Sequence, residues 1–282
     1  MKLMTLNTHS LQEPHYADKL ELFVETIRRE QPDVIALQEV NQTALAPSAS
    51  DELLTGLFPC RENSLPIRED NHAAHAARLL RHAGLECSWT YMPVKTGYGI
   101  YDEGLAFLCT GWEITASDSF YISGITDYQN WKTRRAAGIR IHGCDDWFYT
   151  VHTGWWQDTE EPFKDQWKRL NNALEQKRQN HTVWLSGDFN SPAELRGEGC
   201  DLILSDGWYD TRQLAAQKDE SGVTVRGRID GWREEHHPFP DGMRLDYIWC
   251  SRPAPVKSSR VIFNGSYEPE VSDHYGVIIE TG

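Results

Sequence analysis

The sequence has no hydrophobic run long enough to cross a bilayer and no closely spaced pair of cysteines. Its first ten residues hold only a short apolar run before Asn7, too short for the core of a signal peptide. We therefore expect a cytoplasmic protein. Because the six cysteines lack any C-x-x-C spacing, the sequence indicates neither a zinc site nor a redox dithiol. Cys109 and Cys250 end apolar runs, which predicts buried core thiols rather than disulfides.

Basic residues are scarce relative to acidic ones. Lysine and arginine total 28 against 42 acidic residues, which gives a net charge of −14. Such a chain repels a nucleic-acid backbone unless its basic residues gather on one face. The largest basic group, Lys132, Arg134 and Arg135, is too small to follow a duplex but large enough to hold one phosphate. We therefore do not expect a nucleic-acid partner.

No internal repeat, low-complexity tract or linker divides the chain, so we expect one domain over residues 1–282. The composition, with 39% apolar and 25% charged residues, is typical of a globular protein with a sizeable core. Apolar residues at helical spacing predict helices over residues 18–30 and 72–82 and a third that begins near Pro162. The segment from about 42 to 71 is predicted as loop with some helix. Strands are predicted over residues 3–6, 34–37, 88–92, 104–109, 136–141, 147–151, 182–185, 243–250 and 276–280.

Polar side chains recur where the predicted apolar strands begin or end. They are Asn7, Glu39, His152, Asp188, Asn190 and the pair Asp273 and His274. The ends of neighbouring strands converge in space, so we expect these residues to line a single cleft. Taken one at a time they have structural alternatives, since Asp and Asn also favour turns and a strand-end carboxylate also serves solubility. Taken together they predict a catalytic site.

The segments around these residues carry a family resemblance. In chain order, TLNTHS, ALQEVN, VHTGWW, SGDFNSP, RLDYIW and VSDHYGV resemble the motif set of the endonuclease/exonuclease/phosphatase superfamily. That superfamily includes DNase I-like nucleases, inositol polyphosphate phosphatases and sphingomyelinases. The resemblance runs from Asn7 to His274, nearly the whole chain. It implies an α/β fold, a four-layered sandwich of two mixed β-sheets packed face to face with helices outside.

The resemblance also implies a magnesium ion, with Mn²⁺ as a possible substitute. Glu39 is implied as the principal metal ligand, and Asn7 is implied to support the metal side of the site. Hard oxygen ligands suit magnesium, which usually takes one or two protein carboxylates and keeps several waters. Asp188 is implied to orient and deprotonate the attacking water, and Asn190 to hold a phosphoryl oxygen.

Two histidines and three further carboxylates complete the implied set. His274 and His152 are implied to stabilise charge on the phosphate, because a phosphoester otherwise repels its nucleophile. Asp273 is implied to orient His274, and Asp246 resembles the family aspartate near that histidine. Glu103, in DEGLAFL, resembles the residue that orients the first histidine and is the expected partner of His152.

The expected substrate is a small phosphorylated sugar. The segments TDYQNWKTRR, SPAELRGEG, WYDT and RIDGWRE resemble a bacterial branch of the superfamily that includes maltose 6'-phosphate phosphatase. On that resemblance Lys132 and Arg134 hold the phosphate or sugar, although a surface salt bridge is an equal alternative. Aromatic residues expected near the cleft can stack on sugar rings or fill the core. They are Trp131, Trp155, Trp156, Trp232, Tyr98 and Tyr101; of the adjacent Trp155 and Trp156, only one is expected to face the site.

Other classes stay open at this point. A nuclease needs a basic face, and a sphingomyelinase-like phosphodiesterase needs an exposed apolar hairpin and usually export; the sequence signals neither. A binding protein that has lost catalysis is disfavoured by the intact acid, amide and imidazole set. We expect no membrane partner, and the sequence leaves the oligomeric state undetermined. Five histidines lie outside the strand-end pattern and are expected to be exposed or loop residues rather than ligands: His72, His75, His82, His236 and His237.

Overall fold

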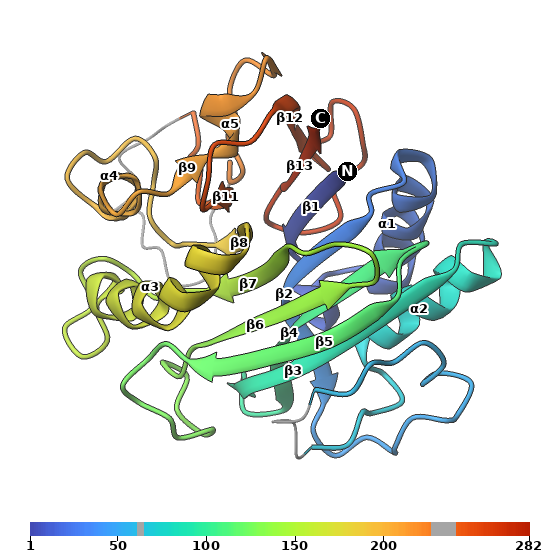
Figure 1. Cartoon of the computed structure of the whole chain (residues 1–282). Helices are drawn as coiled ribbons and strands as arrows, with labels where there is room; N and C mark the ends of the chain where they lie inside the picture. Colours follow the sequence, from blue (N-terminus) through green and yellow to red (C-terminus); the bar gives the residue numbers. More distant parts are fainter. Residues whose placement is uncertain (61–64, 227–240) are drawn as a thin grey trace.

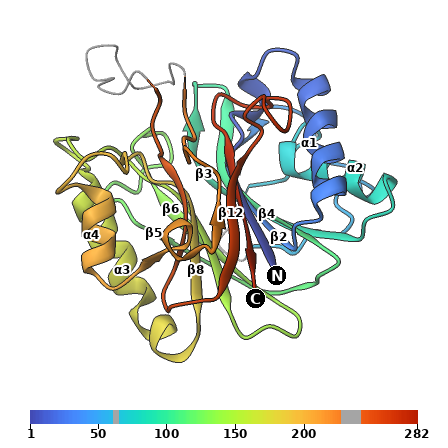
Figure 2. The ribbon, with the colours of Figure 1, turned by 90° about the horizontal axis from the view of Figure 1, so that it is seen from above.

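Two β-sheets packed face to face form the centre of the protein, with helices on both outer sides (Figures 1 and 2). The computed structural model describes residues 1–60, 65–226 and 241–282. The predicted four-layered α/β sandwich is confirmed. The motif RIDGWRE with Trp232, and the residues His236 and His237, lie outside the described residues.

The first sheet has seven strands in the order β10-β12-β13-β1-β2-β4-β3. It is mixed, because β1 pairs with β2 in parallel whereas β1–β13, β2–β4 and β3–β4 are antiparallel. The strands are β1 (Lys2–Asn7), β2 (Val34–Thr43), β3 (Cys87–Gly97), β4 (Tyr101–Thr110), β10 (Gln217–Lys218), β12 (Val256–Ile262) and β13 (Gly276–Thr281).

The second sheet has six strands in the order β5-β6-β7-β8-β11-β9. It too is mixed, since β7 and β8 run parallel while β8 and β11 run antiparallel. The strands are β5 (Ile114–Tyr121), β6 (Arg135–Ile141), β7 (Trp147–His152), β8 (Val183–Asp188), β9 (Tyr209–Asp210) and β11 (Asp246–Cys250). The parallel pairs β1–β2 and β7–β8 therefore lie inside their sheets, where most of the predicted site residues are carried.

Helices cover the outer face of each sheet (Figure 2). Helices α1 (Tyr16–Glu30) and α2 (His72–His82) lie on the first sheet, and α3 (Phe163–Asn180) and α4 (Gly199–Ser205) lie beside the second. The short helices are η1 (Ser10–Gln12) and α5 (Thr211–Leu214). Each long helix buries an apolar stripe at helical spacing. In α3 that stripe is Phe163, Trp167, Leu170 and Leu174, all fully buried.

The apolar core between the two sheets draws on both of them. Phe107 from the first sheet and Phe148 and Ile248 from the second belong to one buried cluster. Cys109 and Cys250 belong to the same cluster, so the predicted core thiols are confirmed. Within the residues that the structure covers, no helix combines the length and apolar character needed to traverse a bilayer.

Several elements depart from what the sequence predicts. Strand β5 was expected to be loop, because its residues ITASDSFY contain few apolar side chains; it is an edge strand that pairs only with β6 and is mostly half-buried. Strand β12, which lies between β10 and β13, was missed because four polar residues, Lys257 to Arg260, interrupt its apolar ones. His72 was expected to be exposed, but it begins α2 and is buried against Tyr16, whose hydroxyl lies 3.0 Å from its Nδ1.

We predict that His72 makes the fold sensitive to acid. Burial lowers the pKa of His72 from 6.5 to about 3, with a smaller effect of His75 in the same direction. The folded state therefore favours the neutral form of the ring. The stability that this preference contributes is complete above the pKa of His72 in the unfolded chain, and it is lost as the pH falls toward the pKa in the folded protein. Between about pH 7 and about pH 5 this linkage costs about 2 kcal/mol.

Urea unfolding of the wild type and of His72→Gln across that pH range measures the effect. The difference in free energy of unfolding between the two proteins should shrink by about 2 kcal/mol on acidification, since Gln has no proton to bind. A difference that is constant with pH would contradict the assignment.

Candidate active site

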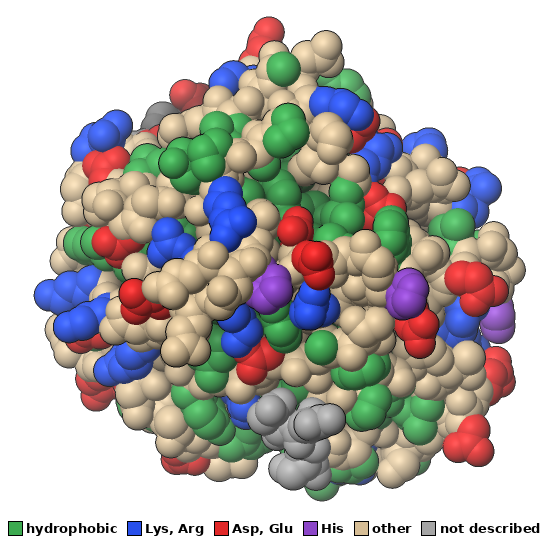
Figure 3. All heavy atoms as spheres, in the orientation of Figure 1, with side chains coloured by type: hydrophobic (Ala, Val, Ile, Leu, Met, Phe, Trp, Pro, Cys, Tyr) green, Lys and Arg blue, Asp and Glu red, His purple; other side chains and the backbone are tan. Residues whose placement is uncertain are grey.

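A cavity of about 290 Å³ opens where the ends of the two sheets meet. Acidic, basic and histidine side chains gather near the middle of the face shown in Figure 3. The cavity is lined by His9, Glu39, Lys95, Thr96, Gly97, Tyr98, Glu103, Trp131, Arg134, His152, Trp155, Asp188, Asn190, Asp273 and His274. The polar residues predicted at strand ends therefore do line one cleft, although they come from both sheets, with the exception of Asn7, which is buried against Glu39 and Asp188.

Glu39 reaches the cavity from a β-bulge and not from the end of a strand. Strand β2 continues to Thr43, and its register against β4 shifts between Leu37 and Val40, so that two residues of β2 oppose one of β4. Glu39 has φ +50°, the left-handed conformation that costs a non-glycine residue of the order of 1–2 kcal/mol. On the adjacent strand β4, position 104 must be glycine, because a Cβ on Gly104 would lie 2.4 Å from the carbonyl oxygen of Met92. The bulge turns Glu39 toward the second sheet.

Asp188 is the last residue of β8 and is buried. The preceding Gly187 has φ +138°, and a Cβ there would lie 2.0 Å from the carbonyl oxygen of Val151. Only glycine allows this approach of β8 to β7. Asp188 Oδ1 accepts a hydrogen bond from the backbone N–H of Asn190 at 2.8 Å, and the Asn190 side-chain amide donates to the carbonyl of Thr153 at 2.9 Å.

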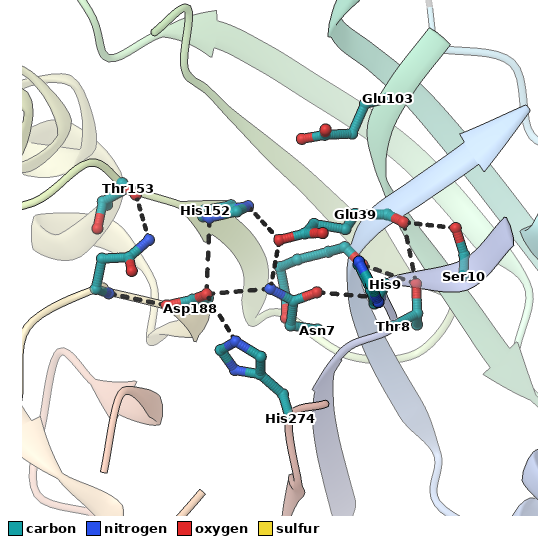
Figure 4. A network of polar contacts seen from close by, with 12 residues as sticks. Asn7, Thr8, His9, Ser10, Glu39, Glu103, His152, Thr153, Asp188 and His274 are labelled. Atoms are coloured by element: carbon teal, nitrogen blue, oxygen red, sulfur yellow. Dashed lines mark hydrogen bonds and ion pairs between the residues drawn. The ribbon is translucent and has the colours of Figure 1, made fainter. Parts of the chain in front are cut away.

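The side chain of Asn7 joins the two carboxylates (Figure 4). Its Nδ2 donates to Glu39 Oε1 at 2.9 Å and to Asp188 Oδ2 at 3.1 Å, while its Oδ1 accepts the backbone N–H of His9 at 3.2 Å. Asn7 was expected to support the metal ion. In this arrangement its amide N–H groups donate to the two carboxylates and hold them in place, and the expected metal role stays a prediction.

His274 is oriented by Asp246 and not by Asp273. Its Nδ1 lies 2.9 Å from Asp246 Oδ2, and its Nε2 lies 3.7 Å from Asp188 Oδ2. Burial alone would lower the pKa of His274, but the charges of Asp246 and Asp188 raise it well above its usual range. The expected role of Asp273 is therefore corrected. Its backbone N–H donates to Glu13, and its charge raises the pKa of Glu39, which places its carboxylate on the Glu39 side of the cavity.

His152 lies between the two carboxylates that Asn7 joins. Its Nδ1 is 3.7 Å from Glu39 Oε1 and its Nε2 is 3.6 Å from Asp188 Oδ2. Burial, with the charges of Arg134 and Lys95, lowers the pKa of His152 well below its usual range, so the ring is neutral. Glu103 was expected to orient this ring. Instead its Oε1 lies 2.7 Å from Lys95 Nζ, and Figure 4 shows Glu103 apart from His152.

The residues predicted for substrate binding divide into two groups. Trp131, Trp155 and Arg134 line the cavity, with the two indole rings 5.7 Å apart. Lys132 does not line the cavity: its Nζ pairs with Asp158 and with Glu160, each at 2.8 Å, and lies 5.2 Å from the ring centroid of Trp131. The salt-bridge alternative therefore holds for Lys132, because alternate residues of this loop face opposite ways.

The adjacent tryptophans separate as the sequence predicts. Trp155 lines the cavity, while Trp156 packs on Phe163 in the core, with ring centroids 6.1 Å apart. Tyr98 lines the cavity but Tyr101 does not.

Four cavity residues carry no prediction from the sequence: His9, Lys95, Thr96 and Gly97. His9 lies two residues after Asn7 on the same turn, so its position beside a strand end was the available signal. Its Nδ1 lies 2.8 Å from Glu13 Oε1; burial opposes the charge, but Glu13, Asp273 and Glu39 raise the pKa of His9 to about 9. Lys95 and Thr96 follow a second bulge, in β3, that no pattern in the sequence predicts.

The acidic groups of the cavity destabilise one another. Burial, with the charges of Glu103 and Asp273, raises the pKa of Glu39 to about 7, and burial, with the charge of Asp246, raises that of Asp188 to about 6. Glu39, His152 and Asp188 offer ligand atoms that all lie within 4.8 Å of one another. A divalent cation relieves such crowding, and carboxylate oxygens are the ligands that hard cations prefer. The donor set therefore fits a divalent metal ion.

Comparisons with known proteins identify the family of this chain. The family profile described as Endonuclease/Exonuclease/phosphatase family matches residues 4–274. An endonuclease/exonuclease/phosphatase family protein from Leptotrichia buccalis is 30% identical with a TM-score of 0.84, over 100% of this chain and 99% of that one. No curated protein sequence matches.

More distant structures share the fold. A Bacteroides thetaiotaomicron mannosyl-6-phosphatase is 15% identical with a TM-score of 0.65, over 100% of this chain and 99% of its own. The human Nocturnin catalytic domain is 19% identical with a TM-score of 0.61, over 100% of this chain and 93% of its own.

The chain belongs to the endonuclease/exonuclease/phosphatase family, as the sequence motifs indicated. Members of this family are hydrolases that act on phosphoesters and generally depend on a divalent metal ion.

We predict that the backbone of Glu39 is strained and that this conformation is retained because it places the carboxylate in the site. Replacement by Gly and by Ala removes the same carboxylate, but only Gly adopts φ +50° freely. Glu39→Gly should therefore be more stable than Glu39→Ala by about 1 kcal/mol in free energy of unfolding, with both variants inactive. At Glu21, exposed within α1, the order should reverse by a similar amount, because Gly weakens a helix. Equal stability of the two Glu39 variants would show that the bulge carries no strain.

Proposed function

We propose that this protein is a magnesium-dependent phosphatase that releases phosphate from a sugar phosphate such as maltose 6'-phosphate. The observation that carries the proposal is the arrangement of one cavity. On one side lie Asp188 and His274, on another lies Glu39, and the outer part is bounded by the indole rings of Trp131 and Trp155. Phosphate chemistry and a sugar-stacking surface thus share one space.

Glu39 would hold the ion, with Asp273 as the nearby second carboxylate. Oxygen ligands and few protein carboxylates suit Mg²⁺, and Mn²⁺ accepts the same donors. When bound, the metal supplies Lewis-acid stabilisation of the charge on a phosphoryl oxygen. The high pKa of Glu39, caused by burial and by Glu103 and Asp273, is the electrostatic cost that a cation removes.

Asp188 is the base in this proposal. Its Oδ1 is held by the backbone of Asn190 and its Oδ2 by Asn7, so the carboxylate cannot rotate away from the cavity. A water beside Asp188 is oriented by the carboxylate and gives it a proton as the water attacks phosphorus. Burial keeps the proton affinity of Asp188 above that of an exposed carboxylate, which favours this transfer.

The two histidines and Asn190 act on the phosphoryl oxygens. His274, charged and fixed by Asp246, donates from Nε2 and neutralises charge as the phosphate accepts the nucleophile. His152 is neutral and donates a hydrogen bond without adding charge. Asn190, whose side-chain amide donates to the carbonyl of Thr153, lines the same cavity and would hold a phosphoryl oxygen.

The sugar would occupy the outer part of the cavity. Trp131 is 51% exposed and tilted against Trp155, a geometry that gives a sugar ring an aromatic face to stack upon. The shared fold with a mannosyl-6-phosphatase supports a sugar phosphate over a polymer. The net charge of −14 supports a small substrate in place of a nucleic acid.

One observation favours a second candidate, a phosphodiesterase that acts at a membrane surface. The sequence was expected to lack an exposed apolar hairpin, but the turn between β3 and β4 carries Tyr98 and Ile100, 51% and 54% exposed. Leu45, 94% exposed, lies beside this turn, because the N–H of Ala44 donates to the carbonyl of Ile100. This apolar rim borders the cleft and would contact a lipid surface.

A phosphate-release panel tests the proposal. The substrates are maltose 6'-phosphate, other hexose phosphates, a nucleotide, plasmid DNA and sphingomyelin, each with and without Mg²⁺. We expect Mg²⁺-dependent release from the sugar phosphates. Asp188→Asn and His274→Asn should each lower kcat by about a hundredfold or more while the thermal unfolding curve stays cooperative.

Asp145→Asn, an exposed carboxylate away from the cavity, is the matched control and should retain wild-type rates. Cleavage of DNA without hydrolysis of any sugar ester would refute the substrate class. Cleavage of sphingomyelin alone would select the second candidate. Wild-type rates in both site variants would refute the catalytic assignment.

We further predict that Trp131 contributes sugar binding and not chemistry. Trp131→Ala should raise KM for maltose 6'-phosphate by about tenfold, since one lost stacking contact costs about 1 kcal/mol or slightly more. KM for glycerol 3-phosphate, which has no ring, should stay unchanged. Tyr267→Ala, which removes an exposed aromatic outside the cavity, serves as control. An equal rise in KM for both substrates would place Trp131 in the phosphate site instead.

A further inference from the structure

Two buried cations close the inner end of the cavity. Lys95 is 8% exposed and Arg134 is 4% exposed, and both line the same space as Glu39 and His152. Their proximity to the reacting groups is electrostatic as well as geometric, because both charges depress the pKa of the His152 ring. Neither residue has a role in the catalytic steps described above.

Arg134 is held in place by backbone atoms and has no close carboxylate. Its Nη1 donates to the carbonyl of Trp131 at 2.8 Å and to that of Thr133 at 3.3 Å. Its buried Nε makes no hydrogen bond, and among the described residues no carboxylate lies within 4.0 Å of the guanidinium. Glu103, Glu39 and Asp188 attract this charge from farther away, but a buried guanidinium with no carboxylate in contact keeps donors for an anionic ligand in the cavity.

Lys95 is placed beside Arg134 by the bulge of β3. The register against β4 shifts between Pro93 and Lys95, and Lys95 then pairs with Glu103 at 2.7 Å. An ammonium retains two further N–H donors after one such contact. Lys95 therefore adds a second cationic donor to the same end of the cavity.

Packed core lies behind the two cations. A small cavity of about 10 Å³ is lined by both cations together with Val94 and Leu105, which belong to a buried apolar cluster with Met92 and Ala137. The space next to the two cations on this side is therefore small.

We propose that Lys95 and Arg134 form an anion seat for the terminal oxygens of a phosphomonoester dianion, and that this seat sets the preference for monoesters over diesters. The inference rests on the proposed function, because it assigns specificity within the same cavity. A monoester carries two negative charges near neutral pH and a diester carries one, so two buried cations that line the cavity favour the monoester by charge.

The experiment compares two chromogenic substrates in the intact protein with Mg²⁺. p-Nitrophenyl phosphate is the monoester and bis(p-nitrophenyl) phosphate is the diester. Arg134→Gln and Lys95→Gln should each lower kcat/KM for the monoester by about a hundredfold and for the diester by less than about threefold. Arg134→Lys should restore part of the monoester rate, because it returns the charge without the fork of donors.

Lys132→Gln is the matched control. It removes a cation from the same loop that pairs with Asp158 outside the cavity, so the ratio of the two rates should stay at the wild-type value. Equal losses for both substrates in folded Arg134→Gln would overturn the proposal, since they would show a general structural effect.

Binding of inorganic phosphate separates this inference from the proposed function. Calorimetric titration should give a Kd at least about tenfold weaker in Arg134→Gln and Lys95→Gln than in the wild type and in Lys132→Gln. If the wild type hydrolyses no monoester, the proposed function fails while this binding result still decides the anion seat. Unchanged phosphate affinity in both variants would overturn the seat whatever the activity.

Discussion

The amide of Asn7 joins the two sheets at the point where the proposed chemistry takes place. It stands at the end of β1 in the first sheet and donates to Glu39 of the same sheet and to Asp188 of the second. A second amide, Gln38 Nε2, crosses the same seam to Thr150 Oγ1 at 2.7 Å. The position of the carboxylates therefore depends on how the sheets are packed, and the packing depends on the apolar cluster that they share. The geometry of the site therefore depends directly on the packing of the core.

Strain and buried charge concentrate around the same seam. Of the non-glycine residues with positive φ, His9, Glu39, Tyr98 and Asn190 all line the cavity. Glu39 and Asp188 are also carboxylates whose pKa values burial raises. Backbone strain and crowded charge each lower the stability of the folded state, and they persist where the surrounding structure over-determines them. Here the surrounding structure is thirteen strands in two sheets, which leave the cavity residues little freedom.

Apolar patterns close together along the chain predicted the individual strands and helices, whereas the layers and most site roles were implied by the family resemblance of the motifs. Apolar runs identified the inner strands, and the motif resemblance collected Glu39, Asp188 and His274 into one cleft. The sequence was less able to predict which site side chains pair with one another, since these pairs depend on contacts between residues far apart in the chain. The expected pairs Asp273 with His274 and Glu103 with His152 gave way to Asp246 with His274 and Glu103 with Lys95. Edge strand β5 was missed because exposed edges need few apolar side chains.

Gly104 lies between two register shifts, one on each neighbouring strand. The bulge of β2 delivers Glu39 on one side, and the bulge of β3 delivers Lys95 on the other. Each of the two strands beside β4 therefore has one extra residue opposite it. Between the two bulges, only glycine is small enough at position 104 of β4. An insertion or deletion in either neighbour would reverse which residues face the cleft, because strand side chains alternate. The acidic and the cationic ends of the cavity are thus coupled through a position that has no side chain at all.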